Sequence, residues 1–509
     1  MTLVFRASVL SVVTASLSPA FAQCACDHTV GTDVLTLNGT DLGIQPGDTV
    51  CIEGGAREFL RLYDLVGTPT DPIVVTNCNG QVDIDNPDRG YGLTLSGSSF
   101  VRITGTGDPA HTYGFRVRAS RDGPDYSASC IIADGFSTNY ELDHLEAREC
   151  GFAGVSAKTD PTCDDRDLRS FVQRDSRLHH LYLHDTGGEG IYFGSTGYPS
   201  RTRTCDGVDV DLFPHSHDGV WIHDNLIERT GWDGAQVGVS TDCHVFRNRI
   251  DGVGLEGVQY QVQGFQFGGG SSCHVTDNHF SDGPAIGIFV LGTGDMWVAN
   301  NVVDGFQDGI YLNDQGAADA VGASYQVVHN TVVGVTDRGI TMYGPSTVGN
   351  AVVNNLVVDG GTAPLGIGGD VDATESGNLV LAGVSDAQFV DAGGGDFQLQ
   401  STSPAVDAGV DASGWGVAVD ALGAARDAMP DVGAFEYGAP PPPEGDTDTD
   451  TDADTDVDTD TDADSDADTD TDTDTDTKPD PLLTEDGCGC TAARDTSVWT
   501  GLLAMVARR

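Results

Sequence analysis

The fold is decided by residues 220–238, which read VWIHDNLIERTGWDGAQVG. In this stretch Asn225 is followed nine residues later by Gly234, a glycine that opens a short apolar strand. The same spacing returns at Asn248/Gly257, Asn278/Gly287, Asn300/Gly309 and Asn330/Gly339, and with leucine in the asparagine position at Leu145/Gly154 and Leu181/Gly190. Internal repeats of about 20 to 50 residues indicate a solenoid or a related repeat architecture.

The repeat length and the residue pattern both predict a β-solenoid. Successive glycines from Gly234 to Gly339 lie 23, 30, 22 and 30 residues apart, which is the length of one coil. Recurrent asparagine at a turn can bond the backbone locally and stack as an amide ladder, and glycine permits a sharp corner. Apolar residues that alternate with polar ones point one strand face inward: Val220, Ile222, Val245, Val275 and Val327.

These repeats resemble the right-handed parallel β-helix proteins of the pectate-lyase-like superfamily over residues 35–385. The entry segment 44–52, IQPGDTVCI, resembles the opening coil of many carbohydrate-active β-helices, and Pro72–Val75 resembles their second strand. We therefore expect an all-β fold, a right-handed parallel β-helix over 23–387. This fold hosts lyases, hydrolases, epimerases and inert adhesins, so it does not assign chemistry.

The C-terminal part divides into three further segments. Residues 388–437 resemble the closing segment of bacterial surface β-helix proteins called choice-of-anchor Q, which we expect to cap the last coil. Residues 438–484 contain a proline run and a Thr-Asp tract, expected to be a disordered spacer, with calcium binding as the alternative. Residues 485–509, with Cys488-Gly489-Cys490, resemble the myxobacterial C-terminal sorting signal, which implies attachment to the outer cell surface.

Both ends of the chain and its cysteines predict export. Residues 1–22 have the charge, apolar core and small-residue cleavage site of a signal peptide. The chain has 12 cysteines, and in an oxidising compartment the ten between Cys24 and Cys273 permit five disulfides. Cys243 and Cys273 each lie five residues before a repeat asparagine, so we expect them to be inward neighbours on adjacent rungs. The predicted location is secreted, on the outer cell surface.

The charge of the chain restricts its partners. The formal net charge is −53, and acidic residues outnumber basic ones outside the Thr-Asp tract as well. Nucleic acids need a basic face, so they are excluded as partners. We expect a monomer.

The repeat register predicts a column of carboxylates. The residues before three strand glycines are Glu189, Asp233 and Glu256, which would stack on neighbouring coils. Carboxylates about 5 Å apart on adjacent rungs raise a pKa or attract a cation such as Ca²⁺. Alternate rungs, about 10 Å apart, are near the upper limit for the two carboxyls of an inverting glycosidase. The alternative is a column without function on an acidic surface, and metal ligands stay unassigned.

Further candidate residues lie around this column. An outward column of Tyr192, Gln236 and Gln259 follows the same glycines, and Trp221 and Trp232 could stack on sugar rings. The longest insertion, 195–217, is expected to overhang the column, and its His217 is a candidate general base, although plain loop histidines are common.

Two hypotheses about function remain open. The first is a surface-anchored protein that binds or cleaves extracellular polysaccharide, as a hydrolase or lyase if it is an enzyme. Residues 187–194 resemble one strand motif of alginate and chondroitin lyases, but the matching downstream lysine is absent and Lys158 lies upstream. The second is a non-catalytic adhesin or coat protein in which the solenoid is a rigid rod.

Overall fold

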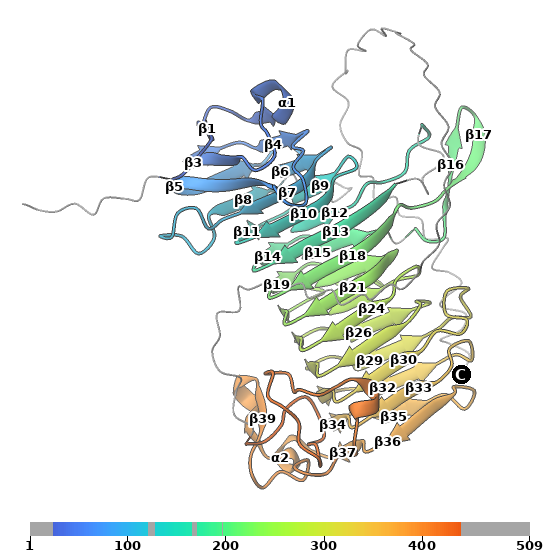
Figure 1. The fold of residues 1–509 in the computed structure, drawn as a ribbon. Helices are drawn as coiled ribbons and strands as arrows, with labels where there is room; N and C mark the ends of the chain where they lie inside the picture. The colour runs from blue at the N-terminus through green and yellow to red at the C-terminus, as the bar shows by residue number, and fades with distance from the viewer. Residues whose placement is uncertain (1–23, 121–127, 165–170, 196, 439–509) are drawn as a thin grey trace, which may run out of the picture.

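The computed structural model describes residues 24–120, 128–164, 171–195 and 197–438. The predicted signal peptide, the Thr-Asp spacer and the sorting tail lie outside these residues. Within them the chain forms a right-handed parallel β-helix whose coils stack along one axis (Figure 1), which confirms the predicted fold class.

The coils from residue 99 to residue 367 each contribute one strand to a 12-stranded parallel sheet and two strands to a 23-stranded sheet, whereas the earlier coils contribute one strand to each sheet. The 12-stranded sheet holds β2 (Thr36–Asn38), β4 (Leu60–Tyr63), β6 (Tyr91–Ser96), β9 (Ser129–Asp134), β12 (Val155–Ala157), β15 (Ile191–Gly194), β20 (Ala235–Gly238), β23 (Phe265–Phe267), β26 (Ile286–Leu291), β29 (Asp308–Asn313), β32 (Arg338–Tyr343) and β35 (Ala363–Ile367).

The 23-stranded sheet consists of two columns of strands that share the long strands β3 and β5. The first column holds β1 (His28–Val30), β3 (Thr49–Arg57), β5 (Ile73–Asn86), β7 (Ser99–Thr104), β10 (Thr138–Asp143), β13 (Val172–His179), β18 (Ser216–His223), β21 (Ser240–Phe246), β24 (Cys273–Thr276), β27 (Met296–Ala299), β30 (Tyr325–Val328), β33 (Asn350–Val353) and β36 (Ala373–Ser376). The second holds β8 (Phe115–Ala119), β11 (Leu145–Arg148), β14 (Tyr182–Thr186), β19 (Leu226–Thr230), β22 (Arg249–Asp251), β25 (His279–Ser281), β28 (Val302–Asp304), β31 (Thr331–Val335), β34 (Leu356–Gly360) and β37 (Leu379–Leu381).

An asparagine ladder runs along the turn between these two columns. The ladder begins where Asn225 Nδ2 donates to Asn248 Oδ1 over 2.9 Å, and the bond repeats on every following rung. The prediction of Asn300 as a member of the ladder is wrong. Asn301 occupies the ladder position, and Asn300 turns toward the closing segment. The ladder comprises Asn225, Asn248, Asn278, Asn301, Asn330, Asn355 and Asn378.

The strand glycines are required by close packing rather than by an unusual backbone angle. A Cβ on Gly234 would lie 2.4 Å from Ile250 Cγ2 and 2.5 Å from the Gly264 carbonyl oxygen. Gly190 and Gly309 are confined in the same way by an inward apolar side chain and by the glycine of the next coil. An inward side chain and the backbone of the next coil already fill the space at this corner, so no side chain fits there.

Five disulfides join the ten described cysteines, as predicted. The pairs are Cys24–Cys78, Cys26–Cys51, Cys130–Cys150, Cys163–Cys205 and Cys243–Cys273. Cys243 and Cys273 are register partners of β21 and β24 with Cα atoms 4.4 Å apart, which confirms that they are stacked inward neighbours.

Residues 388–437 pack against the flank of the last coils. The segment contains β38 (Phe389–Asp391), η2 (Ala392–Gly394), β39 (Asp396–Leu399) and η3 (Ser413–Trp415), and lies beside β34 and β37 in Figure 1. Phe389 and Phe397 cover outward apolar residues of β28, β31 and β34. Val380 of the final coil stays 44% exposed, so the segment covers a side of the rod rather than its end.

Only two short α-helices occur in the described ranges, α1 (Gly39–Leu42) near the first coil and α2 (Val384–Ala387) before the closing segment. Neither has the length or the apolar character that a membrane-spanning helix needs.

Candidate functional site

Two of the three predicted carboxylates stack on adjacent coils. Ile191 of β15 pairs with Ala235 of β20, so Glu189 and Asp233 stand at equivalent positions directly before these strands. Both side chains are buried, with 1% of Glu189 and 0% of Asp233 exposed. The sequence therefore placed this pair correctly on neighbouring rungs.

Glu256 does not belong to the column. Strand β20 pairs with β23, where Ala235 meets Phe265, so the strand glycine of this coil is Gly264 and the column position falls to Gln263. Glu256 and Gln259 lie in an exposed turn before that strand. The nine-residue spacing failed here because the turn is longer, which removes the alternate-rung pair that an inverting glycosidase would need.

The two acidic residues sit on turns of the same construction. The segments Thr186–Gly190 and Thr230–Gly234 share the order Thr-Gly-x-acid-Gly. In each, the threonine Oγ1 donates over 2.9 Å to the carbonyl of the residue two positions later. Gly231 N donates to Thr186 O over 2.7 Å, which locks the second turn onto the first. This repeated motif is a sequence signal for the pair that does not depend on the asparagine spacing.

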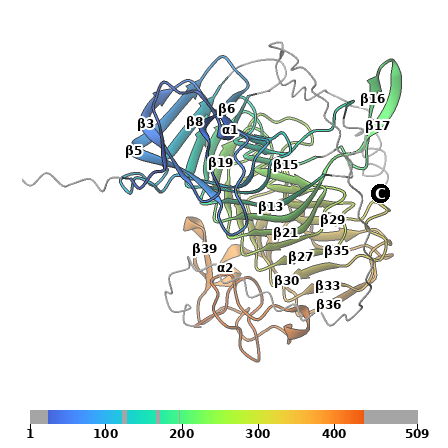
Figure 2. The ribbon, with the colours of Figure 1, turned by 45° about the horizontal axis from the view of Figure 1, so that its top comes forward.

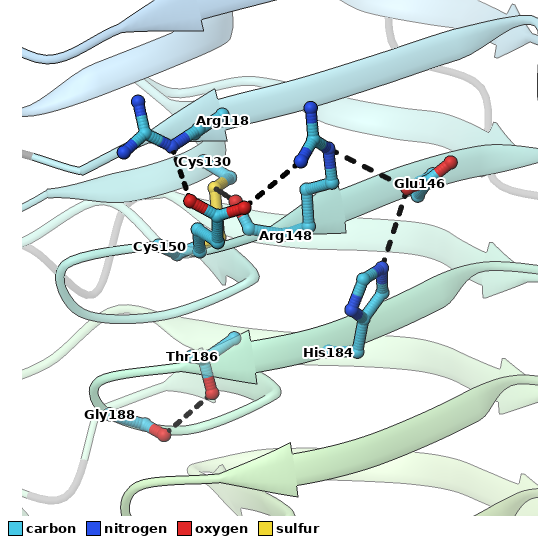
Figure 3. Close-up of a disulfide and its surroundings, with 9 residues drawn as sticks. Arg118, Cys130, Glu146, Arg148, Cys150, His184, Thr186 and Gly188 are labelled. Atoms are coloured by element: carbon cyan, nitrogen blue, oxygen red, sulfur yellow. Dashed lines mark hydrogen bonds and ion pairs between the residues drawn. A yellow bond between two sulfur atoms is a disulfide. The ribbon is translucent and has the colours of Figure 1, made fainter.

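The first of these turns rests on the Cys130–Cys150 disulfide. Figure 3 shows this bridge one coil before the Thr186 turn, with the Thr186–Gly188 hydrogen bond below it. Gly187 N donates to Cys150 O over 2.8 Å. Because the covalent bridge fixes that backbone, the position from which Glu189 projects is fixed as well.

Each carboxyl has one oxygen bonded and one oxygen without a hydrogen-bond partner in the described structure. Gln236 Nε2 donates to Glu189 Oε1 over 2.7 Å, and Gln263 N donates to Asp233 Oδ1 over 2.7 Å. Glu189 Oε2 and Asp233 Oδ2 are shielded from solvent and accept no bond from the described residues. A buried acceptor of this kind is costly unless a proton, a cation or a ligand satisfies it.

Burial and mutual repulsion set the protonation of the pair. Burial raises the pKa of Glu189 to about 8. Burial first, and the Glu189 charge second, raise the pKa of Asp233 well above its ordinary value. Adjacent rungs lie about 4.8 Å apart, so the pair holds at most one negative charge near neutral pH.

The outward column beside the pair differs from the predicted one at a single position. Tyr192, Gln236 and Gln266 are register partners on β15, β20 and β23, so Gln266 takes the place predicted for Gln259. Lys158 also joins this surface, because its Nζ lies 4.3 Å from the Tyr192 ring centroid. Lys158 lies upstream of the strand motif in the sequence, whereas a lyase of this type has its lysine downstream. The coil register nevertheless brings Lys158 beside the pair.

The oxygen atoms of this surface match the ligand preference of calcium. Glu189 Oε2, Asp233 Oδ2, Gln236 Oε1 and Gln266 Oε1 are buried and accept no hydrogen bond within the described ranges. Carboxylate and amide oxygens are the ligands that Ca²⁺ takes in proteins. These four atoms on three adjacent rungs are candidate cation ligands.

The two candidate tryptophans lie on different faces of the β-helix. Trp232 packs edge-on against Phe152, 5.5 Å away between centroids, in the cluster that contains Tyr192. Trp221 belongs to β18 of the 23-stranded sheet and does not share a face with Tyr192. Its ring stacks on His244 at 4.1 Å and lies under Arg177 at 5.5 Å, so both ring faces are covered.

His217 is a core residue rather than an overhanging one. It lies near the start of β18, is 1% exposed, and packs 5.0 Å from the Phe193 ring. Burial lowers the pKa of His217 to about 3. A neutral buried imidazole inside the wall cannot act on a substrate outside it, so the placement contradicts its predicted position above the column.

The 195–217 insertion forms a projecting hairpin. Strands β16 (Arg201–Cys205) and β17 (Val208–Leu212) pair antiparallel and extend away from the coils in both views (Figures 1 and 2). The part before the hairpin lies along the rod, because a Cβ on Gly269 would meet the Tyr198 ring at 2.7 Å. The insertion therefore reaches over later coils through Tyr198.

Comparison with known proteins supports the architecture. A family model described as a right handed beta helix region matches residues 210–381. No curated protein matches the chain.

Several solved structures are similar at low identity. GH136 lacto-N-biosidase from Eubacterium ramulus is 15% identical with a TM-score of 0.41, over 66% of this chain and 62% of that chain. Pectate lyase Pel9A is 13% identical with a TM-score of 0.39, over 80% and 96%. A mannuronic acid specific polysaccharide family 6 lyase from human gut microbiota is 14% identical with a TM-score of 0.38, over 68% and 80%.

Such TM-scores do not assign an activity to the chain. Its fold is established by its own strand register and by the matching family model, and the chain is a right-handed parallel β-helix with a buried carboxyl pair on adjacent coils.

Proposed function

We propose that this protein binds and cleaves extracellular polysaccharide at the outward face of β15, β20 and β23. The observation that carries the proposal is the pair Glu189 and Asp233, each with a buried oxygen that accepts no hydrogen bond from the described residues. Buried carboxyls with raised pKa values cluster at acid–base sites, because burial keeps one proton available near neutral pH.

The spacing of the pair suits glycosidic bond cleavage. Retaining glycosidases hold two carboxyls about 5 to 5.5 Å apart, close to the separation of adjacent β-helix rungs. The protonated carboxyl would donate to the leaving sugar oxygen, and the ionised one would stabilise or attack the anomeric carbon. Gln236 and the Gln263 backbone N–H would hold the two groups in place.

A lyase reaction is the second form of the proposed cleavage, and Lys158 is the residue that supports it. Its Nζ lies beside Tyr192 and forms an ion pair with Asp160 at 3.0 Å. A lysine shielded from water can serve as a base that removes the proton from the sugar carbon that bears the carboxylate, while the bond to the leaving sugar oxygen breaks. The products distinguish the two reactions, because a lyase leaves an unsaturated sugar and a hydrolase does not.

A non-catalytic surface rod is the second candidate function, and the burial of the pair favours it. With 1% and 0% of the two side chains exposed, a polysaccharide reaches them only after the covering groups move. In a rod the same oxygens would hold a cation that fastens neighbouring coils. Export through residues 1–22 and surface attachment through residues 485–509 are part of both candidates.

The deciding experiment uses the purified protein on a panel of neutral, acidic and amino polysaccharides. Reducing ends and ultraviolet absorbance of unsaturated products are followed for the parent and for Asp233→Asn. Products that disappear in Asp233→Asn support cleavage at this site. A parent that releases no product from any polymer, with calcium and without it, contradicts cleavage and supports the rod.

A further inference from the structure

We propose that the outer face of β24, β27 and β30 is a separate binding site for an uncharged polysaccharide. This face belongs to the 23-stranded sheet, whereas the carboxyl pair belongs to the 12-stranded sheet. The inference goes beyond the proposed function, because it requires no reaction and no contact with Glu189 or Asp233.

The site is a surface depression of about 470 Å³ on three consecutive rungs. His274, Trp297 and Gln326 are register partners, so their outward side chains form one line along the rod. Ser272 and Ser324 line the same depression at the beginnings of these rungs. Aromatic and aliphatic surface combined with a few placed polar groups is the usual composition of a ligand site.

Two polar atoms of this depression are buried and lack partners within the described residues. One is the donor Trp297 Nε1 and the other is the acceptor Gln326 Oε1. The Gln326 amide is fixed because its Nε2 donates to Ser324 Oγ and to Gly349 O. Its Oε1 is therefore held in one direction, where a hydroxyl of a bound sugar would satisfy it.

The rings of the depression are arranged differently from those further up the same column. Trp221 and His244 stack face to face, so they cover each other. His274 meets Trp297 edge to face, at 4.7 Å and 86°. Because the stack is broken at this rung, indole surface of Trp297 is among the groups that line the depression.

The acidic side chains at the edge of the depression favour an uncharged ligand. Asp242 and Asp295 line the depression and both are exposed, on a chain with a net charge of −53. An acidic polysaccharide would be repelled over its whole length. The serine, glutamine and indole groups are suited to hydroxyl partners, so the structure favours an uncharged sugar chain.

The test is affinity electrophoresis of the full chain in gels that contain hydroxyethyl cellulose, dextran, galactomannan, alginate or glycol chitosan. The test variants are His274→Ala/Gln326→Ala, whose side chains are partly exposed, and Trp297→Phe, which removes the N–H and keeps a ring. The control is His111→Ala/Gln398→Ala, with the same residue types outside the depression. Thermal melting confirms that each variant is folded.

We expect retention in at least one uncharged gel, none in alginate, and about fivefold to tenfold weaker binding for both test variants. Equal retention of test variants and parent, retention in alginate, or retention only in glycol chitosan that high salt abolishes would each overturn the proposal. Asp233→Asn is run alongside. If neither the parent nor any variant shows turnover, the proposed cleavage is contradicted. If the test variants lose retention in the same experiment, the binding site proposed here is still supported.

Discussion

Glu189 and Asp233 occupy the same position on consecutive coils, and each has one bonded carboxyl oxygen and one shielded oxygen that accepts no hydrogen bond from the described residues. Two carboxyls in this relationship cannot both ionise cheaply, since burial and repulsion act on them together. The pair must therefore share a proton, bind a cation or meet a substrate. The first, second and fourth predictions below separate these states.

Replacing Asp233 by Asn should abolish any turnover while keeping the fold. The amide nearly preserves the shape of the carboxyl but cannot exchange a proton, so the expected loss of kcat is about a hundredfold or more. Glu256→Gln is the matched control, because Glu256 is an exposed turn residue outside the column. Equal losses in both variants, measured as initial rates of product release, would contradict the register described here.

Stability should fall as pH rises through the range in which Glu189 ionises. Its pKa is about 8 in the folded protein against an ordinary value of 4.5, so between these values the folded state holds a proton that the unfolded state releases. The free energy of unfolding then decreases by up to about 1.4 kcal/mol per pH unit, and the contribution is lost above pH 8. Urea unfolding in the presence of a chelator measures it. Glu189→Gln should flatten the slope; an unchanged slope would show that Glu189 does not carry it.

His217 should produce the opposite slope on the acid side. Its pKa is about 3 in the folded protein against an ordinary value of 6.5, so below pH 6.5 the unfolded state takes up a proton that the folded state does not. Stability is lost as pH falls through this window. His217→Gln should reduce the acid-side loss, whereas His111→Gln, in the loop between β7 and β8, should leave it unchanged. Similar acid profiles for all three proteins would contradict the prediction.

Calcium should stabilise the protein and release protons when it binds. Ligand carboxyls must be deprotonated, so Ca²⁺ competes with the proton that the pair holds near neutral pH. The melting temperature should rise with calcium concentration, more steeply at pH 8 than at pH 6, and calorimetry in two buffers should detect the released proton. Gln266→Leu removes one amide oxygen and should weaken the effect. If Asp233→Asn responds to calcium as the parent does, the ions bind elsewhere.

Two neighbouring asparagines should have separable roles. Asn301→Ala interrupts the buried amide ladder and leaves its partners unpaired, so a loss of about 1 to 3 kcal/mol in the free energy of unfolding is expected. Asn300 instead donates to Val419 O and accepts from Arg426, which joins the closing segment to the coils. Asn300→Ala should mainly increase proteolysis within 388–437. Identical melting and proteolysis of the two variants would refute this division.

The sequence by itself determined the repeating part of the protein. A coil is specified locally, because alternating apolar residues, a turn asparagine and a strand glycine recur within each repeat. This information also placed Cys243 beside Cys273 and Glu189 beside Asp233. The ladder could have been located more securely from the Val or Ile that lies three positions before every ladder asparagine except Asn378. Val298 and Asn301 follow that rule, whereas the residue three positions before Asn300 is Trp297.

Only the tertiary structure decided what the turns between strands do. Parallel strands stack through backbone hydrogen bonds that are indifferent to the number of residues in a turn, so an inserted turn moves the sequence without moving the rung. For this reason Glu256 lies in a turn and Gln263 takes the column position. The strand pairing also assigns Trp221 to the 23-stranded sheet and brings Lys158, from the preceding coil, next to Tyr192. Burial is likewise a property of neighbouring coils, and it gives Glu189 and Asp233 their raised pKa values.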